Sequence, residues 1–329
     1  MTPTNSKAAQ PLFPPVPMTP EINRLVADIC EQVGALTALQ PSVVPLRLRR
    51  DCQVRSVQAS LQIEGNNLGV EQVTALINGR RVLGAPKDIQ EARNALEAYE
   101  KMANWNPWRL ADLLDAHTVL MRALVDRPGK LRSGGVGIQR GEKVVHVAPP
   151  AGRVPALIKA LLAEIKTTPD HPLVASCRFH YEFEYIHPFS DGNGRLGRLW
   201  QTLLLAQWRP IFASLPVETL VRDRQADYYA ALNASNDTGH AAPFVTFMLA
   251  TIRDALTEAA KVGSQKTTQK SSQKILSLLQ NNPEFTIADL GARLGLSDRA
   301  IKNHLASLKT QDRLRRIGPD KGGRWDVVS

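Results

Sequence analysis

Residues 187–198 read HPFSDGNGRLGR and hold side chains that could act together in chemistry. Apolar residues recur at helical spacing in residues 173–186 and again in residues 199–208, which predicts a loop between two helices. Gly192 and Gly194 bracket an asparagine and let successive backbone N–H groups turn inward. The next helix is expected to begin at about residue 195, so its positive dipole end faces the same point. The pattern predicts an anion site, and phosphate is its natural occupant.

Charged side chains in the same stretch add to this prediction. Arg195 and Arg198 lie three residues apart, on one side of the helix, and can donate forked hydrogen bonds to phosphate oxygens. Asp191 supplies a hard oxygen ligand for Mg²⁺. His187 stands at the loop entrance and, with the ordinary histidine pKa of about 6.5, can accept a proton from an incoming nucleophile. Together they predict a polyphosphate site with a base beside it.

Two simpler interpretations compete with the phosphate site. A glycine-rich connection that carries two arginines can be only a turn, because short motifs are weak when they stand alone. His180, Glu184 and His187 also form one helical stripe, at the spacing of zinc-binding helices. A zinc site would give the GNGRLGR segment no role, so we favour the phosphate site.

The stretch resembles the signature of the Fic family, HPFx(D/E)GNGRxxR, and matches it at every defined position. Most characterised Fic proteins transfer AMP from ATP to a hydroxyl side chain of a target protein, and the resemblance implies the same activity with Mg²⁺ here. It implies that His187 is the catalytic base, that Asp191 holds the metal, and that Pro188 and Phe189 are structural. Catalytic charge neutralisation and nucleotide binding are implied for Asp191, Gly192, Asn193, Gly194, Arg195, Leu196, Gly197 and Arg198.

A second motif lies upstream, at the end of a helix predicted for residues 45–64. Residues 60–65 read SLQIEG and fit (S/T)xxxE(G/N), which resembles the inhibitory-helix motif of Fic proteins. Gly65 is expected to end the helix in a left-handed conformation. The resemblance implies that Ser60, Glu64 and Gly65 are inhibitory and that Glu64 pairs with Arg198. The alternative is an exposed glutamate at a helix end.

Residues 128–150 interrupt the helical pattern with glycines at 134, 135, 137 and 141 and two short β-branched runs, 136–138 and 144–147, which predict a hairpin. The segment resembles the Fic flap, which clamps the target as an added strand. An ordinary surface hairpin is the alternative. If the resemblance holds, the backbone that borders the nucleotide belongs to Val136, Gly137, Ile138 and Gln139.

A helix predicted for residues 221–234 carries Tyr228, and Asn236 follows it. Fic proteins border adenosine with an equivalent tyrosine and asparagine, so the resemblance makes these two residues candidates for the same role. Packing in an aromatic core is the alternative for Tyr228. His117 lies on the apolar face of a helix predicted for residues 108–124 and is interpreted as a core histidine.

The length of 329 residues indicates two or three structural parts, because single cores rarely exceed about 250 to 300 residues. We predict a mainly α protein: a Fic-type helical core with a β-hairpin flap, plus a C-terminal winged helix-turn-helix domain. The parts expected are an N-terminal helical region with the inhibitory helix (1–105), the catalytic core (106–260), a polar linker (261–272) and the winged helix (273–329).

The last part shows the pattern of a winged helix-turn-helix. Helices are predicted at 273–280 and 286–294, a third helix is capped by Ser297, and two short strands flank a glycine-rich wing. Residues 270–329 hold 11 Lys and Arg against 6 Asp and Glu, the balance that DNA binding favours. Winged helices also serve as protein-interaction or dimer modules, so DNA, a protein partner and a homodimer all remain open.

Composition bounds the remaining choices. A formal net charge of +10 favours acidic partners such as nucleotides or nucleic acid. Three cysteines, odd in number and not at metal spacing, indicate a reducing compartment. No apolar run approaches about 18 residues and no secretory leader is recognised, so we expect a cytoplasmic protein without a membrane partner.

These observations favour a protein adenylyltransferase that modifies Ser, Thr or Tyr of a target protein or of itself, with Glu64 holding it inactive. One alternative is a DNA-binding regulator whose Fic core only senses nucleotide. The intact His187 argues for the enzyme, since sensing needs no base. A Fic enzyme that moves a different phosphate-linked group, and one that removes AMP, also remain open.

Overall fold

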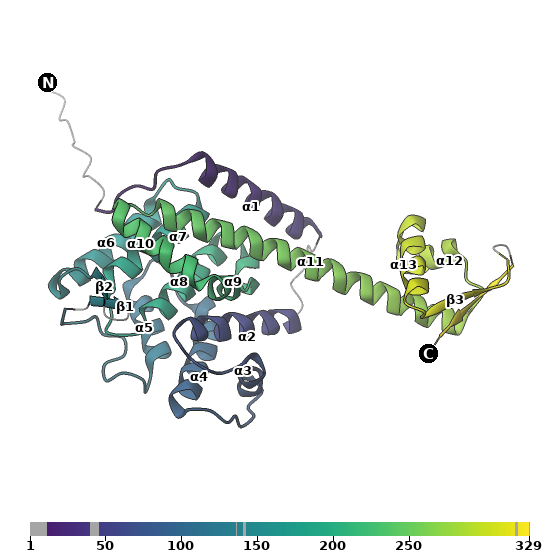
Figure 1. Cartoon of the computed structure of the whole chain (residues 1–329), viewed down its shortest axis with the longest axis horizontal. Helices are drawn as coiled ribbons and strands as arrows, with labels where there is room; N and C mark the ends of the chain where they lie inside the picture. The colour runs from purple at the N-terminus through teal and green to yellow at the C-terminus, as the bar shows by residue number, and fades with distance from the viewer. Residues whose placement is uncertain (1–11, 40–45, 136, 141–142, 320–321, 329) are drawn as a thin grey trace, which may run out of the picture. The chain divides into compact units, whose positions relative to one another are not determined.

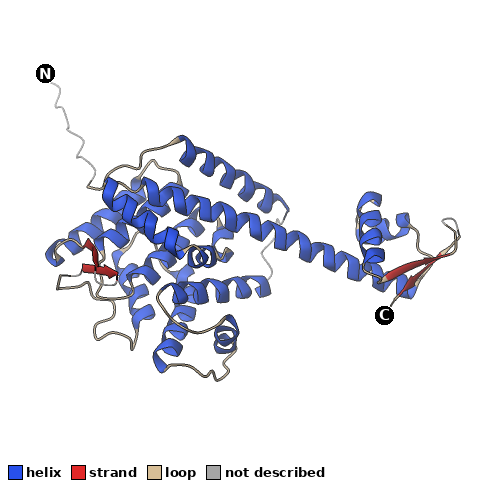
Figure 2. Cartoon of the chain, in the orientation of Figure 1, coloured by secondary structure: helices blue, strands red, loops and turns tan. Residues whose placement is uncertain are grey.

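A computed structural model describes residues 12–39, 46–135, 137–140, 143–319 and 322–328, with the backbone alone described at 39, 46–49, 137–140, 143–146 and 262–270. These residues form helices and two small antiparallel hairpins (Figure 2), which confirms the predicted mainly α class. The chain divides into two compact units, Met1–Thr257 and Glu258–Ser329. Among the described residues, no helix combines the length and the apolar character needed to cross a bilayer.

The larger unit is a bundle of helices with one hairpin (Figure 1). Its main apolar cluster draws buried side chains from seven of these helices, α2 to α8. The elements of this unit are α1 (Pro20–Leu39), α2 (Leu46–Ile63), α3 (Val70–Ile77), α4 (Pro86–Lys101), α5 (Leu110–Met121), β1 (Gly137–Arg140), β2 (Lys143–Val147), α6 (Val154–Thr167), α7 (Pro172–Ile186), α8 (Asn193–Trp208), α9 (Val217–Asp223), α10 (Gln225–Thr238) and the first part of α11 (Ala242–Asn281).

Helix α7 is buried on all sides over most of its length, as expected of a central helix. Pro172 opens it at a position that needs no N–H donor, and the His171 ring accepts the Leu173 N–H at 3.2 Å. It packs against α8, while α2 packs against both α4 and α9. The loop between α7 and α8, residues 187–192, therefore rests on the best-buried part of the unit.

The hairpin predicted for residues 128–150 is present. Strands β1 and β2 pair antiparallel, from Gly137 opposite Val147 to Arg140 opposite Lys143, with an irregularity in register after Ile138. Val136 lies outside the described residues. Gly137, Ile138 and Gln139 belong to β1, so the predicted nucleotide-bordering segment is an extended edge, as strand addition would need.

The smaller unit has the predicted winged helix-turn-helix architecture. Its elements are the last part of α11, α12 (Ile287–Leu294), α13 (Asp298–Thr310), β3 (Leu314–Ile317) and β4 (Arg324–Val327). Thr286 and Asp289 form a capping box at the start of α12, and Ser297 caps α13 by accepting the Ala300 N–H. Strands β3 and β4 form the wing, and Trp325 joins helix side chains in the core of this unit.

Three element boundaries differ from the sequence-based expectation. Helix α8 begins at Asn193, not at about 195, because Gly192 already serves as the N-cap in a left-handed conformation. The helix predicted for 221–234 is two helices, α9 and α10, separated at Arg224. The backbone of the expected linker, residues 261–272, is helical within α11, since its Ser, Thr, Gln and Lys residues are compatible with a helix. The division at residue 105 stays a prediction.

Candidate active site

The loop after α7 turns at His187, which adopts a left-handed conformation with φ of 48°. Glycine is the usual residue at such a helix end, and a side chain there is strained, which points to a functional requirement for this histidine. Arg132 holds the turn: its Nε donates to the His187 carbonyl at 2.7 Å, and its backbone N–H donates to the Pro188 carbonyl at 2.9 Å. A second guanidinium nitrogen of Arg132 donates to the Gly134 carbonyl, so one buried arginine ties the loop to the base of the hairpin.

Phe189 and Asn193 fix the centre of the loop. The Asn193 side chain accepts the Phe189 N–H at 3.0 Å and donates to the Phe189 carbonyl at 2.9 Å. The fully buried Phe189 ring stacks on His117, with centroids 3.7 Å apart and planes within 7° of parallel. The structural role predicted for Phe189 is therefore confirmed.

His117 is a core histidine, as predicted. Its Nδ1 accepts the Gly129 N–H at 2.8 Å, and its Nε2 donates to the Asp191 carbonyl at 3.0 Å. Burial lowers the pKa of His117 to about 4, so the ring is neutral at physiological pH. A neutral ring with one donor and one acceptor satisfies both contacts.

The N-terminus of α8, here called the α8 nest, has the close backbone approach from which an anion site was predicted, and anion binding there stays a prediction. Gly192 has φ of 84°, and a Cβ there would collide with Met121. A Cβ at Gly194 would collide with the Glu64 carboxylate, which lies directly over the first turn of α8. A carboxylate oxygen of Glu64, from the end of α2, therefore lies beside the N-terminus of α8.

Arg198 and Glu64 form the ion pair that the resemblance implied. Arg198 is buried, with 3% of its side chain exposed, and donates to Glu64 Oε1 at 2.7 Å. It also donates to the Ser60 hydroxyl and the Ser60 carbonyl, both at 3.0 Å. Burial opposes the charge of Arg198, but the Glu64 carboxylate raises the pKa of the guanidinium above its usual range. These three acceptors belong to the SLQIE segment around the end of α2.

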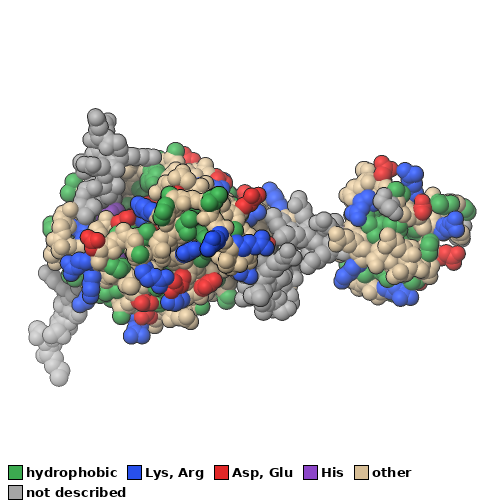
Figure 3. Space-filling model, turned by 90° about the horizontal axis from the view of Figure 1, so that it is seen from below, with side chains coloured by type: hydrophobic (Ala, Val, Ile, Leu, Met, Phe, Trp, Pro, Cys, Tyr) green, Lys and Arg blue, Asp and Glu red, His purple; other side chains and the backbone are tan. Residues whose placement is uncertain are grey.

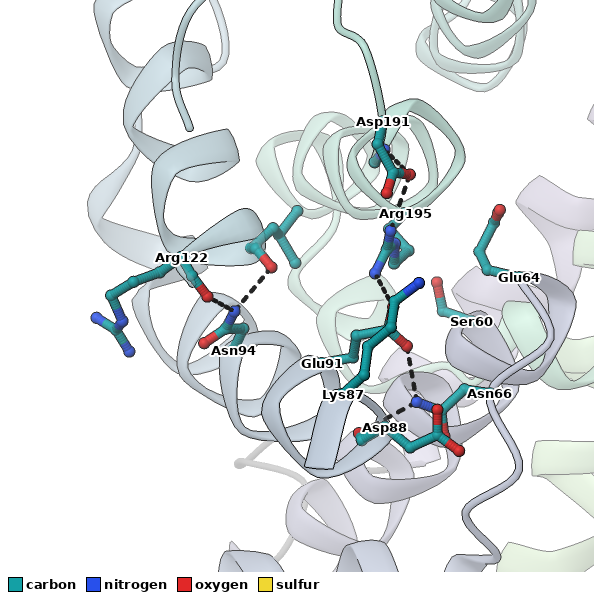
Figure 4. Close-up of polar contacts among 12 residues, drawn as sticks. Ser60, Glu64, Asn66, Lys87, Asp88, Glu91, Asn94, Arg122, Asp191 and Arg195 are labelled. Carbon is teal, nitrogen blue, oxygen red and sulfur yellow. Dashed lines mark hydrogen bonds and ion pairs between the residues drawn. The ribbon is translucent and has the colours of Figure 1, made fainter. Parts of the chain in front are cut away.

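Arg195 points away from Glu64, although it lies only one turn earlier on α8. Its guanidinium lies 3.1 Å from Glu91 Oε1 on α4 and 3.1 Å from Asp191 Oδ1 (Figure 4). Only 6% of its side chain is exposed. The phosphate contact expected of Arg195 stays a prediction, and the observed contacts show an arginine that holds Asp191.

Asp191 fits the magnesium role expected of it. Its carboxylate is half exposed and borders the cavity described below, while Oδ1 accepts the Gly192 N–H at 2.6 Å and an Arg195 N–H at 3.1 Å. Within the described part of the chain, no group of three or more His, Cys, Asp or Glu could hold a metal by itself. Such a site suits Mg²⁺ held by one carboxylate with nucleotide phosphates and water. The same result gives no support to a zinc triad of His180, Glu184 and His187.

A cavity of about 330 Å³, a size suited to a small ligand, brings together predicted residues from the end of α2, α8, the loop before α8, and α10. Arg195, Leu196 and Gly197, also predicted to bind nucleotide, are not among the residues that line it. His187 and the α8 N-terminus border one part of it, with Glu64 and Arg198 beside them. Helix α10 lines another part, including the predicted pair Tyr228 and Asn236. The remaining lining residues are Tyr181, Glu184, Tyr185, Ser190, Asp191, Gly192, Asn193, Gly194, Tyr229, Leu232 and Asn233.

Tyr228 packs among aromatic side chains and also lines the cavity, while its contact with adenosine stays a prediction. It is 2% exposed and packs against Phe244, yet it borders the cavity. Its hydroxyl donates to His180 Nε2 at 3.2 Å, and His180 Nδ1 donates to Gln201 at 2.7 Å. Burial lowers the pKa of His180 to about 3, so this network is neutral. Asn236 accepts the Tyr181 hydroxyl at 3.1 Å.

Glu184 is a buried acid in the cavity wall, with 12% of its side chain exposed. Burial raises its pKa to about 7, the charge of Glu64 adds to the rise, and Arg198 opposes it. Two carboxyl groups thus act on one arginine, and Glu64 is the one that forms the direct contact.

Helix α9 and the start of α10 hold α2 in place. The buried Glu218 accepts the Ser56 hydroxyl of α2 at 2.8 Å. Arg222 donates to Gln58 of α2, and Gln225, at the start of α10, donates to the Ile63 carbonyl at 2.8 Å. The last contact lies directly before Glu64 in sequence.

Sequence reasoning missed the residues that support the site from other helices. These are Glu91 on α4, Arg132 before the hairpin and Glu218 on α9. Each is a charged residue that is buried in the structure. Their neighbours in sequence include polar residues as well as apolar ones, so no local signal marks them as buried.

Comparisons with known proteins agree with this geometry. A family model described as Fic/DOC family matches residues 107–205, and one described as HTH domain matches residues 272–312. Protein adenylyltransferase fic-1 of Caenorhabditis elegans is 28% identical over 261 residues, which cover 75% of this chain and 49% of that protein. Protein adenylyltransferase Fic of Aedes aegypti is 27% identical over 215 residues, covering 61% and 40%. The chain thus spans about half the length of the curated relatives it matches.

A solved structure gives a broader match. The crystal structure of a Fic family protein from Desulfovibrio desulfuricans G20 shares 49% sequence identity, with a TM-score of 0.73. The match covers 96% of this chain and 98% of that one. With this identity along nearly its whole length, the chain belongs to the Fic family.

Proposed function

We propose that this protein is an adenylyltransferase, which transfers AMP from ATP to a Ser, Thr or Tyr hydroxyl of a target protein or of itself. The observation that carries the proposal is the cavity bordered by His187, Asp191 and the α8 N-terminus with Arg198. A base, a magnesium ligand and an anion nest are the parts that nucleotidyl transfer needs. The names of the curated relatives support the same activity.

In the proposed reaction, the target hydroxyl oxygen bonds to the α-phosphorus, and the bond from that phosphorus to the bridging oxygen of pyrophosphate breaks. His187 takes the hydroxyl proton, and the bond-breaking electrons leave with pyrophosphate. The N–H groups of the α8 nest and the Arg198 guanidinium stabilise charge on the phosphates. Asp191 would hold Mg²⁺, which neutralises phosphate charge when bound.

We further propose that Glu64 inhibits transfer. The Arg198 fork that would hold the terminal phosphate of ATP already donates to Glu64 at 2.7 Å. The same carboxylate lies over Gly194, where phosphate oxygens would approach the nest. ATP bound beside Glu64 would have displaced phosphates, and a misplacement of about 1 Å can cost roughly a hundredfold in rate.

The test incubates the purified chain with ATP labelled at the α-phosphate and follows label on protein. We expect Mg²⁺-dependent labelling of the chain or of an added hydroxyl-bearing protein, and loss of labelling in His187→Ala with nucleotide binding retained. Asp191→Ala should lose the Mg²⁺-dependent labelling, because the carboxylate ligand is gone. Parallel reactions with the other nucleoside triphosphates, and with AMP-modified protein as substrate, separate the proposal from transfer of another group and from AMP removal. Labelling by His187→Ala at the wild-type rate would contradict the assigned base.

The winged helix supports DNA binding as a second, separate function. Helix α13 exposes Arg299 and Lys302 on its solvent face, where a recognition helix contacts a major groove. On the face shown in Figure 3, Lys and Arg side chains occur at several separate points of this unit. We propose that the chain binds DNA with an affinity that falls steeply with salt. Reduced binding by Arg299→Ala and Lys302→Ala would support this, and salt-insensitive or absent binding would favour a protein partner.

A further inference from the structure

A chain of buried contacts connects the predicted magnesium ligand to the inhibitory helix (Figure 4). It begins with the Asp191 carboxylate, which lies 3.1 Å from Arg195, and continues to Glu91, whose Oε1 lies 3.1 Å from the same guanidinium. The other oxygen of Glu91 accepts the Asn66 side-chain amide at 2.8 Å. Asn66 lies two residues after Glu64. The Glu91 carboxylate therefore contacts both Arg195, which holds the predicted magnesium ligand, and Asn66, which follows the end of α2.

The residues in this series of contacts differ in exposure. Arg195 and Glu91 have 6% and 8% of their side chains exposed, whereas Asp191 has 50%. A buried guanidinium needs a buried counter-charge, because water does not stabilise it there. Glu91 supplies that counter-charge and leaves the outer part of Asp191 facing the cavity. Without Glu91, the full positive charge of Arg195 would act on Asp191 alone, and so against a cation bound there.

Asn66 holds the other side of the same carboxylate. Its amide also donates to the Asp88 carbonyl at 3.1 Å, and its oxygen accepts the Leu68 N–H at 3.0 Å. These contacts fix the chain directly after α2, and only 4% of Asn66 is exposed. A displacement of the α2 end would therefore pull on Glu91, the partner of Arg195.

We infer that Glu91 is a positioning residue for the divalent cation: through Arg195 it sets the affinity of Asp191 for the metal, and through Asn66 it links that affinity to the inhibitory helix. The inference rests on the proposed function, because Asp191 is taken as the metal ligand. It assigns Glu91 no contact with substrate. Residues that orient a metal ligand in this way usually change metal affinity about 10- to 100-fold when they are replaced.

The test measures Mn²⁺ binding to the full chain by electron paramagnetic resonance, with α,β-methylene-ATP, whose α–β bridge cannot release AMP. We expect Glu91→Gln to weaken Mn²⁺ binding about tenfold or more. Glu91→Asp keeps the charge and should recover part of the affinity. Lys87→Ala is the matched control on α4: Lys87 lies 3.9 Å from Glu91 Oε1, is 71% exposed, and should leave Mn²⁺ binding unchanged.

Binding of the analogue without metal separates positioning from a general structural role. It should be the same in Glu91→Gln and wild type, because the α8 nest and Arg198 are untouched. Equal Mn²⁺ affinity in wild type and Glu91→Gln would overturn the inference, as would equal weakening with and without metal. If Glu91→Gln does not fold, Glu91→Asp provides the test, because its shorter side chain withdraws the carboxylate from Arg195. Mn²⁺ binding by Glu91→Asp equal to that of wild type would also contradict the inference. A wild type that binds no Mn²⁺ with the analogue would contradict the proposed function itself.

Discussion

Arg195 and Arg198 are the same side chain, one turn apart on the same helix, yet their surroundings differ completely. Arg195 faces α4 and the loop, where it lies between Glu91 and Asp191. Arg198 faces α2, where Ser60 and Glu64 accept its hydrogen bonds, and it borders the cavity. One motif thus combines an arginine that organises the site with an arginine that the nucleotide and the inhibitory glutamate would compete for.

The largest effect is expected for Arg198→Ala in a Glu64→Gly background. With Glu64 absent, the role left to Arg198 in our account is to hold phosphate, so transfer should fall by about 10²- to 10³-fold. Initial rates of label transfer, measured at saturating Mg²⁺, give the result. A rate within threefold of the Glu64→Gly parent would remove Arg198 from phosphate binding and end the contrast between the two arginines.

Arg195→Lys should have a smaller effect of a different kind. A lysine keeps the charge but cannot fork between Glu91 and Asp191, so Asp191 should be held less well. We expect transfer to fall about tenfold at limiting Mg²⁺ and to recover as Mg²⁺ is raised. A loss that no Mg²⁺ concentration relieves would show that Arg195 contacts phosphate directly, as the sequence suggested.

Gln225→Ala tests the contact that holds the end of α2. Its side-chain amide donates to the Ile63 carbonyl, directly before Glu64. Losing one hydrogen bond of about 1 kcal/mol should loosen Glu64 and raise the basal transfer rate up to about fivefold. The Mg²⁺ concentration for half-maximal rate should shift as well, because Asn66 links the end of α2 to Glu91. A basal rate equal to wild type would contradict the role given to this contact, and an unchanged Mg²⁺ concentration would contradict the link through Asn66.

Glu184 offers a test through stability and pH. Its pKa is raised to about 7 in the folded protein, chiefly by burial, while an unfolded glutamate has a pKa of about 4.3. The folded state therefore binds an extra proton between these values, and this contribution to stability is lost as pH rises toward 7. Glu184→Gln removes the titration. The melting temperature of the variant minus that of wild type should increase by a few degrees as pH is raised from 5 to 8. A difference that stays constant across this range would contradict the raised pKa.

Local signals in the sequence were enough for most elements that position the site. The Ser297 cap begins α13 where it was expected. The glycines at 192 and 194 indicated a loop that leads into a helix, and Gly192 is the left-handed N-cap of α8. Such features depend on residues close in sequence, so local patterns can predict them.

Local patterns could not predict contacts between residues that are distant in sequence. Nothing in the order of residues shows that Glu91 meets Arg195, 104 positions later, or that α9 holds α2. The Glu64–Arg198 pair was expected only because the second motif resembled a known inhibitory helix. The break between α9 and α10 at Arg224 was also missed, because neither proline nor glycine marks it.

Glu64→Gly gives the most direct test of the central claim, that an adenylyltransferase is held inactive by its own carboxylate. The change removes the anion from Arg198 and from the α8 nest, and glycine is tolerated at a helix end. Transfer of label from α-labelled ATP should be measured for wild type and Glu64→Gly with the same protein target, with Arg55→Ala as a control because Arg55 lies on the exposed side of α2. Our account predicts a rate at least tenfold above wild type for Glu64→Gly and no such rise for the control. A folded, ATP-binding Glu64→Gly variant that is no faster than wild type would contradict it.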